Sequence, residues 1–209
     1  MSQKQFFKDN GYLPISNLIK DSDSLRYPVP LNRGSFTYHG SIDQFQFDPK
    51  EHQVEGSLSR YNFPAYKDLH FLIKKEVENI LEMKLYPTYY YDRFYFANQE
   101  LKVHRDRPAC EISVTLQMST NKEEPWDIWF KNYNNEDVSV TMNNGDGCIY
   151  RGNDLFHWRK PLKSKYNKFQ NYYRKLKKLD DDTYHHQAFF HYVNADGPCL
   201  EYAFDNGNN

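Results

Sequence analysis

The chain has 209 residues, enough for a domain with a substantial core, and its net charge of −1 at pH 7 gives no electrostatic reason to expect nucleic acid or an anionic membrane as a partner. Its three cysteines are too few for a disulfide framework, and no apolar run is long enough to span a bilayer. We therefore expect a soluble, cytoplasmic protein.

The amino-terminal part of the chain contains one clear helical pattern. Residues 1–60 have the composition of short strands and turns, and Pro28 and Pro30 interrupt any long element there. Residues 66–83 instead place apolar side chains at helical spacing on one face, with lysine and glutamate opposite. The apolar positions are Leu69, Leu72, Ile73, Val77, Ile80 and Leu81. We expect Pro87 to end this helix, so residues 1–84 are predicted to form an irregular and helical support.

Residues 85–200 have the pattern of strands separated by turns rich in asparagine, aspartate and glycine. An early helix followed by many short strands predicts a mainly β core, closed or sandwiched, with supporting helices. The whole chain, residues 1–209, is predicted to be a single domain.

One basic segment interrupts the succession of strands. Residues 163–179 contain many lysines and arginines, with Tyr166, Phe169, Tyr173 and Leu176 at helical spacing. The pattern predicts a helical insertion. It fits either a solvated helix on the rim of the β core or a mobile lid that helps to bind an acidic or extended substrate.

His104 and Asp106 form the most informative motif in the chain. Residues i and i+2 of a strand point to the same face, so both side chains can reach one metal ion. A His-x-Asp pair with one distant histidine is the ligand set of the facial triad that holds Fe(II) in non-haem oxygenases. Four later histidines could supply that third ligand, namely His157, His185, His186 and His191. We favour His157 because it follows the Gly145-Asp146 turn and a short strand, and His191 is expected to be a core or second-layer histidine.

These residues resemble the 2-oxoglutarate/Fe(II)-dependent dioxygenases, especially their prolyl-4-hydroxylase-like branch. The resemblance covers roughly residues 85–200 and includes the motif His104-x-Asp106, Gly145-Asp146 ahead of His157, and the strand pattern of residues 185–193. Residues 6–15 are more weakly similar to the start of such domains. The resemblance implies a double-stranded β-helix, a jelly-roll or cupin-like barrel, with His104, Asp106 and His157 as catalytic metal ligands.

The resemblance also implies the chemistry. Fe(II), 2-oxoglutarate and O₂ are the expected cofactor and cosubstrates, with ascorbate as an optional accessory reductant, and succinate and CO₂ are the expected co-products. A small molecule or a peptide would be hydroxylated. Hydroxylation is favoured over halogenation because Asp106 leaves no ligand position free for a halide. The sequence indicates neither the prime substrate nor an oligomeric state.

The chain departs from the family pattern at the residue for the far carboxylate of 2-oxoglutarate. The family has an arginine or lysine at the start of the strand after the second histidine, whereas residues 184–187 here are Tyr-His-His-Gln. Arg159, two residues after His157, points into the barrel by strand parity and is the predicted substitute. The other residues expected to bind the cosubstrate or line its cavity are Tyr95, His185, Gln187, Thr115 and Gln117.

Two other functions compatible with the same barrel remain open. One is a non-catalytic cupin-like protein that binds a metal or a small ligand, and the other is an isomerase-type cupin that needs no cosubstrate. The chain lacks the dense His-x-His and glutamate cluster that such cupins use, which favours the oxygenase.

Overall fold

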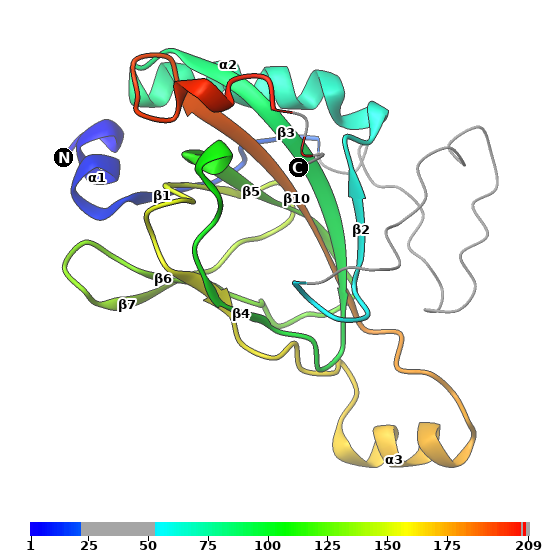
Figure 1. The fold of residues 1–209 in the computed structure, drawn as a ribbon. Coiled ribbons are helices and arrows are strands. Elements are labelled where there is room, and N and C mark those ends of the chain that lie inside the picture. Colours follow the sequence, from blue (N-terminus) through cyan, green and yellow to red (C-terminus); the bar gives the residue numbers. More distant parts are fainter. Residues whose placement is uncertain (22–52, 206, 208–209) are drawn as a thin grey trace.

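The computed structural model describes residues 1–21, 53–205 and 207, and its helices and strands form two facing β layers with helices outside them (Figure 1). In chain order the elements are α1 (Gln3–Asn10), β1 (Tyr12–Ile15), β2 (Leu58–Tyr61), α2 (Lys67–Leu81), β3 (Leu85–Phe96), β4 (Leu101–His104), β5 (Ile112–Thr120), β6 (Ile128–Lys131), β7 (Asp137–Val140), β8 (Gly147–Tyr150), β9 (His157–Arg159), α3 (Lys168–Leu176) and β10 (Tyr184–Asn194).

The strands form one six-stranded sheet in the order β1-β8-β5-β10-β3-β2 and one four-stranded sheet in the order β4-β9-β6-β7. Neighbouring strands pair antiparallel in both sheets. The predicted mainly β core with supporting helices is therefore confirmed.

The two faces of the six-stranded sheet differ in chemistry, as the alternation of side chains along a strand requires. On β5, Val114, Leu116 and Met118 lie in the apolar core on the helix side. Ser113, Thr115 and Gln117 alternate with them and are also buried. Buried polar side chains on the face toward the second sheet are unusual for a plain core, and they indicate a site between the sheets.

Helix α2 covers the outer face of the six-stranded sheet (Figure 1). Its Ile73 and Val77 are fully buried against residues of β5 and β10. Burial of a side chain of this size contributes about 1.5–3 kcal/mol relative to exposure. His70 also faces the sheet, where its Nε2 lies 3.2 Å from the carbonyl oxygen of His191.

The structure corrects three details of the predicted amino-terminal support. Helix α1 was not predicted, although Ser2 caps it and Gly11 ends it at a φ of 77°. Leu72 is 51% exposed, and His70 takes a place on the buried face. Pro87 does not end α2, which stops at Leu81, but lies inside β3. The strand tolerates proline there because the register with β10 shifts between Phe190 and Tyr192.

Part of the amino-terminal prediction lies outside the described residues, including the breaks expected at Pro28 and Pro30. The prediction that residues 1–209 form a single domain stays a prediction.

In the described parts of the chain, the helices are too short or too polar to cross a bilayer.

The basic insertion contains helix α3, as its pattern predicted. Asn167 caps the helix in a reciprocal capping box with Gln170, and none of its residues is buried. It lies between the end of β9 and the start of β10, away from the body of both sheets (Figure 1). Its apolar side chains are among the most exposed described here, with Phe169 at 87%.

Candidate metal centre and cosubstrate cavity

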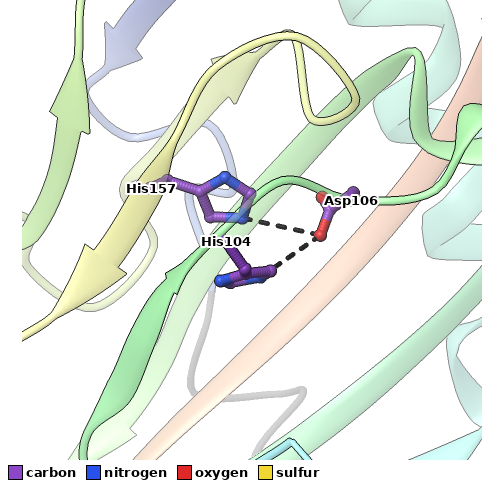
Figure 2. A group of neighbouring side chains, drawn as sticks. All are labelled: His104, Asp106 and His157. Carbon is purple, nitrogen blue, oxygen red and sulfur yellow. Dashed lines mark ion pairs between the residues drawn. The ribbon is translucent and has the colours of Figure 1, made fainter.

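The three side chains of the predicted triad point toward one another (Figure 2). His104 ends β4, His157 begins β9, and the two are direct partners in the antiparallel ladder. Asp106 Oδ1 lies 3.4 Å from His104 Nε2 and 3.5 Å from His157 Nε2. Neighbouring ligand atoms of an octahedral ion at about 2.1 Å are about 3 Å apart, so these distances are close to ligand spacing.

Backbone hydrogen bonds orient both imidazole rings for coordination. His104 Nδ1 lies 2.8 Å from the carbonyl oxygen of Lys102, and His157 Nδ1 lies 3.0 Å from that of Leu155. A carbonyl oxygen only accepts, so each Nδ1 carries the proton and each Nε2 keeps its lone pair toward Asp106. Metal-binding histidines are oriented by partners of this kind.

The electrostatics of Asp106 favour its ionised form. Burial alone would raise its pKa, but the neighbouring imidazoles, His157 first and then His104, hold the pKa of Asp106 well below its usual range because either can take up a proton beside the carboxylate. Burial lowers the pKa of His157, and the Asp106 carboxylate outweighs that effect and raises it. A permanently ionised carboxylate beside two imidazoles is a suitable donor set for a divalent cation.

Gly152 holds the backbone of the Asp106 loop close to the turn after β8. The amide of Asp106 donates to the carbonyl oxygen of Gly152 at 2.8 Å. A Cβ at position 152 would lie 2.5 Å from Asp106 Oδ2 and 2.6 Å from the carbonyl oxygen of Cys110. Since real Cβ atoms do not approach so closely, glycine is required here by space.

Gln53 contacts the triad and is itself bound by Arg93 of β3. The sequence analysis predicted neither residue. Gln53 Nε2 lies 2.7 Å from His104 Nε2, and Gln53 Oε1 accepts from Arg93 Nη1 at 2.9 Å. The Gln53 amide therefore contacts the same lone pair that a metal would use, and the two contacts exclude each other. Arg93 could have been found by parity, because it lies two residues before Tyr95 on one strand face.

Arg159 faces inward with His157, as strand parity predicted, and is 1% exposed. Its Nη1 donates to the carbonyl oxygen of Trp126, and its guanidinium lies 4.8 Å from the centre of the Trp126 ring. Within the described residues, Arg159 Nε and Nη2 have no hydrogen-bond partner. Burial lowers the pKa of Arg159 to about 10, which still leaves the side chain charged at neutral pH.

Most of the other predicted cosubstrate residues gather around Trp126. Its ring packs edge-on against Tyr95 at 4.9 Å and against His185 at 5.0 Å. His185 Nε2 lies 2.9 Å from Gln187 Oε1, and Gln187 Nε2 donates to Thr115 Oγ1 at 2.6 Å. Burial and then the charge of Arg159 keep the pKa of His185 well below its usual value, which favours neutral His185 and leaves Arg159 as the cation of this group.

Gln117 is separate from this group. Its Nε2 donates to Asn144 Oδ1 at 3.3 Å, in the turn before β8. The structure therefore brings together Arg159, Tyr95, His185, Gln187 and Thr115, and it places Gln117 at the turn instead.

The sequence matches no protein-family model, and no curated protein is similar enough in sequence to match it. Its structure is similar to that of a 2OG-Fe(II) oxygenase family oxidoreductase from Burkholderia pseudomallei, with a TM-score of 0.60, 8% identity, and coverage of 98% of this chain and 91% of the other. The fold is that of the 2-oxoglutarate/Fe(II) oxygenases. The double-stranded β-helix expected from the resemblance is thereby confirmed.

Two further structures share this fold. HygX from Streptomyces hygroscopicus, with nickel, 2-oxoglutarate and hygromycin B bound, has a TM-score of 0.58 and 12% identity, covering 91% of this chain and 85% of that one. A prolyl hydroxylase in complex with a hypoxia inducible factor peptide fragment, from Trichoplax adhaerens, has a TM-score of 0.56 and 10% identity, covering 91% and 87%.

Proposed function

We propose that this protein is a 2-oxoglutarate- and Fe(II)-dependent dioxygenase that hydroxylates a small molecule or a peptide. The observation that carries the proposal is the convergence of His104 Nε2, Asp106 Oδ1 and His157 Nε2, with both imidazoles held in the ligand tautomer by backbone carbonyls. These three residues would hold the metal, and a three-residue donor set of this kind would leave room for a chelating cosubstrate and O₂.

Each part of the cavity has a role in this proposal. Bound iron supplies the activation of O₂ that is coupled to decarboxylation of 2-oxoglutarate to succinate and CO₂. Arg159 would bind the far carboxylate through its two unpaired donor atoms, since a guanidinium binds a carboxylate in a planar, two-point geometry. His157 and Arg159 are two residues apart on one strand, about 6.7 Å, which suits a five-carbon diacid with one end at the metal.

Trp126, Tyr95 and the Gln187–Thr115 pair would position the cosubstrate and keep the cavity dry. All are buried, and the low dielectric of such a cavity strengthens the attraction between Arg159 and a carboxylate. Gln53 would have to leave His104 Nε2 when the metal binds, because one lone pair cannot accept a hydrogen bond and coordinate an ion together.

The structural neighbours support this assignment by what they contain. HygX holds nickel and 2-oxoglutarate, and the Trichoplax prolyl hydroxylase holds a peptide. Together they support both substrate classes for this chain without favouring one. We also propose a cytoplasmic location, because Cys110, Cys148 and Cys199 are all free thiols, as in proteins of reducing compartments.

The test is anaerobic addition of Fe(II) and then 2-oxoglutarate to the full-length apoprotein, followed by admission of O₂ and measurement of succinate. We expect a charge-transfer absorption from the iron-bound keto acid and slow succinate release without a prime substrate. His157→Ala should abolish both signals. His70→Gln is the matched control, because His70 is a buried histidine on the opposite face of the six-stranded sheet.

A different outcome would favour the alternative class. A protein that binds Fe(II) through His157 but shows neither the charge-transfer band nor succinate release would be a cupin-like metal-binding protein without oxygenase turnover.

A further inference from the structure

We propose that Cys110, His191 and Asp106 form a second metal site, suited to Zn²⁺, in which Asp106 is shared with the iron site. The three residues come from separate parts of the chain: Asp106 from the loop after β4, Cys110 from the short 3-10 turn Pro108–Cys110, and His191 from β10. One ligand atom from each lies within 4.8 Å of the other two. Cys110 and His191 are each 1% exposed.

The hydrogen bonds of His191 determine which of its nitrogens can bind a metal. Ser113 Oγ lies 3.2 Å from the carbonyl oxygen of Cys110 and 2.8 Å from His191 Nδ1. A carbonyl oxygen only accepts, so Ser113 gives its single proton to Cys110 and accepts from His191 Nδ1. His191 Nε2 therefore carries a lone pair, as a metal ligand must.

Two buried acceptor atoms of this cluster have no donor among the described residues. His191 Nε2 and Asp106 Oδ2 are both buried, and neither has a hydrogen-bond partner in the described part of the chain. Leaving such atoms unpaired in the interior is unfavourable, and a cation bound to both would supply the missing contacts.

Cys110 Sγ is the third ligand atom of the cluster. Tyr89 hydroxyl lies 3.2 Å from Cys110 Sγ, and Arg107 Nε lies 3.5 Å from the same hydroxyl. Because arginine only donates, the Tyr89 oxygen accepts from Arg107, which leaves its own proton able to point to the sulfur. Burial and then the Asp106 charge raise the pKa of Cys110 well above its usual value, so the apoprotein holds a thiol whose proton a bound metal would displace.

The donor set identifies the class of ion. One thiolate, one imidazole and one carboxylate suit tetrahedral Zn²⁺, with water as a fourth ligand, better than they suit Mg²⁺ or Ca²⁺. Asp106 would use Oδ1 toward His104 and His157 and Oδ2 toward Cys110 and His191, so the two ions would be bridged. Gly152 allows this arrangement, since a Cβ there would lie 2.6 Å from Ser113 Oγ and 2.5 Å from Asp106 Oδ2.

The experiment is titration of the full-length apoprotein with Zn²⁺ and with Co²⁺, a spectroscopic substitute that shows a thiolate-to-metal band when sulfur is bound. We expect Cys110→Ser to bind one equivalent of Zn²⁺ less than the wild type and to lose the cobalt band. Cys148→Ser is the matched control, because Cys148 is also a buried free thiol and lies outside the cluster, so it should behave as the wild type.

This proposal can fail separately from the iron site. His157→Ala should lose Fe(II) binding yet keep the thiolate–cobalt band, because His157 is not a ligand of the second ion. Equal zinc stoichiometry in Cys110→Ser and Cys148→Ser, or a cobalt band that persists in Cys110→Ser, would overturn it and leave a buried water as the occupant. Should Cys110→Ser not fold, X-ray absorption of the zinc-loaded wild type decides the question by the presence or absence of one sulfur at about 2.3 Å.

Discussion

His157 and Arg159 lie two residues apart on β9, and both side chains point into the space between the two sheets. His157 Nε2 faces the Asp106 carboxylate, whereas the Arg159 guanidinium rests on Trp126 with two donor atoms unpaired among the described residues. One short strand thus provides the proposed metal ligand His157 and the buried cation Arg159 at a fixed separation.

Substitution of Arg159 should weaken 2-oxoglutarate binding selectively. A charge-assisted pair contributes about 1.5–3 kcal/mol, so Arg159→Ala should raise the dissociation constant of 2-oxoglutarate about ten- to a hundred-fold. Arg159→Lys should recover only part of the loss, because a point charge lacks the planar fork. Calorimetric titration of the Mn²⁺-loaded protein measures both.

The affinity for the metal is the internal control for this prediction, since Arg159 supplies no ligand atom to the triad. Unchanged 2-oxoglutarate affinity in Arg159→Ala would transfer the role to another residue of the cavity. Arg93, the second buried arginine near Tyr95, would then be the next to test.

Gly152→Ala should remove the metal centre by a steric effect. The added methyl group would lie 2.5 Å from Asp106 Oδ2 and 2.6 Å from a backbone oxygen, so the Asp106 loop must move away. We expect at least a ten-fold loss of Fe(II) affinity, measured by competition with a chelator. Gly147→Ala is the matched control, because its closest contact, at 2.6 Å, is the end of the flexible Leu18 side chain. Equal affinities in the two variants would contradict the steric argument.

His70 should make the apoprotein less stable in acid. Burial lowers the pKa of His70 to about 4 from the usual 6.5, which means that the folded state resists protonation and the unfolded state does not. Neutral His70 makes its full contribution to the free energy of unfolding above pH 6.5. That contribution, about 3 kcal/mol, is lost as the pH falls from 6.5 through 4.

Urea unfolding of the wild type and His70→Gln at several pH values measures this contribution. The glutamine keeps a donor for the His191 carbonyl but does not titrate, so its free energy of unfolding should depend less on pH in that window. His191 is the buried histidine whose contribution also changes, because the charge of His70 lowers its pKa, so the difference between the two proteins reports His70 together with this coupling. Parallel pH profiles would show that His70 is not the cause.

Helix α3 should matter for the prime substrate and not for the cosubstrate. It is exposed and basic and has no buried residue, so its removal leaves the buried residues around Arg159 in place. Replacing residues 168–176 with a short glycine-serine linker should leave substrate-free succinate release within about two-fold, and should reduce turnover of the substrate that a metabolite or peptide screen identifies. Equal turnover in the two proteins would make α3 a solvated helix with no role as a lid.

The local sequence determined the elements and the direction of the main site residues. His157 and Arg159 share one face of β9, because side chains alternate along a strand regardless of what lies around it. The same argument does not hold for Asp106, because β4 ends at His104 and Asp106 lies in the loop that follows. The helix over residues 66–83 was predictable from the spacing of its apolar residues. The predicted helix boundaries were less accurate. Pro87 lies within β3, where a shift in register with β10 accommodates a residue that has no backbone N–H to donate.

Only the tertiary structure decided which residues meet. The convergence of Cys110 and His191 beside Asp106 depends on the pairing of β10 with β5 and on the turn at Pro108–Cys110, and no spacing in the sequence indicates it. The same is true of Gln53 at His104 and of Trp126 against Arg159. Periodicity reports the direction of a side chain within its own element, whereas contacts between distant residues depend on strand order and register, which arise from the packing of the whole domain.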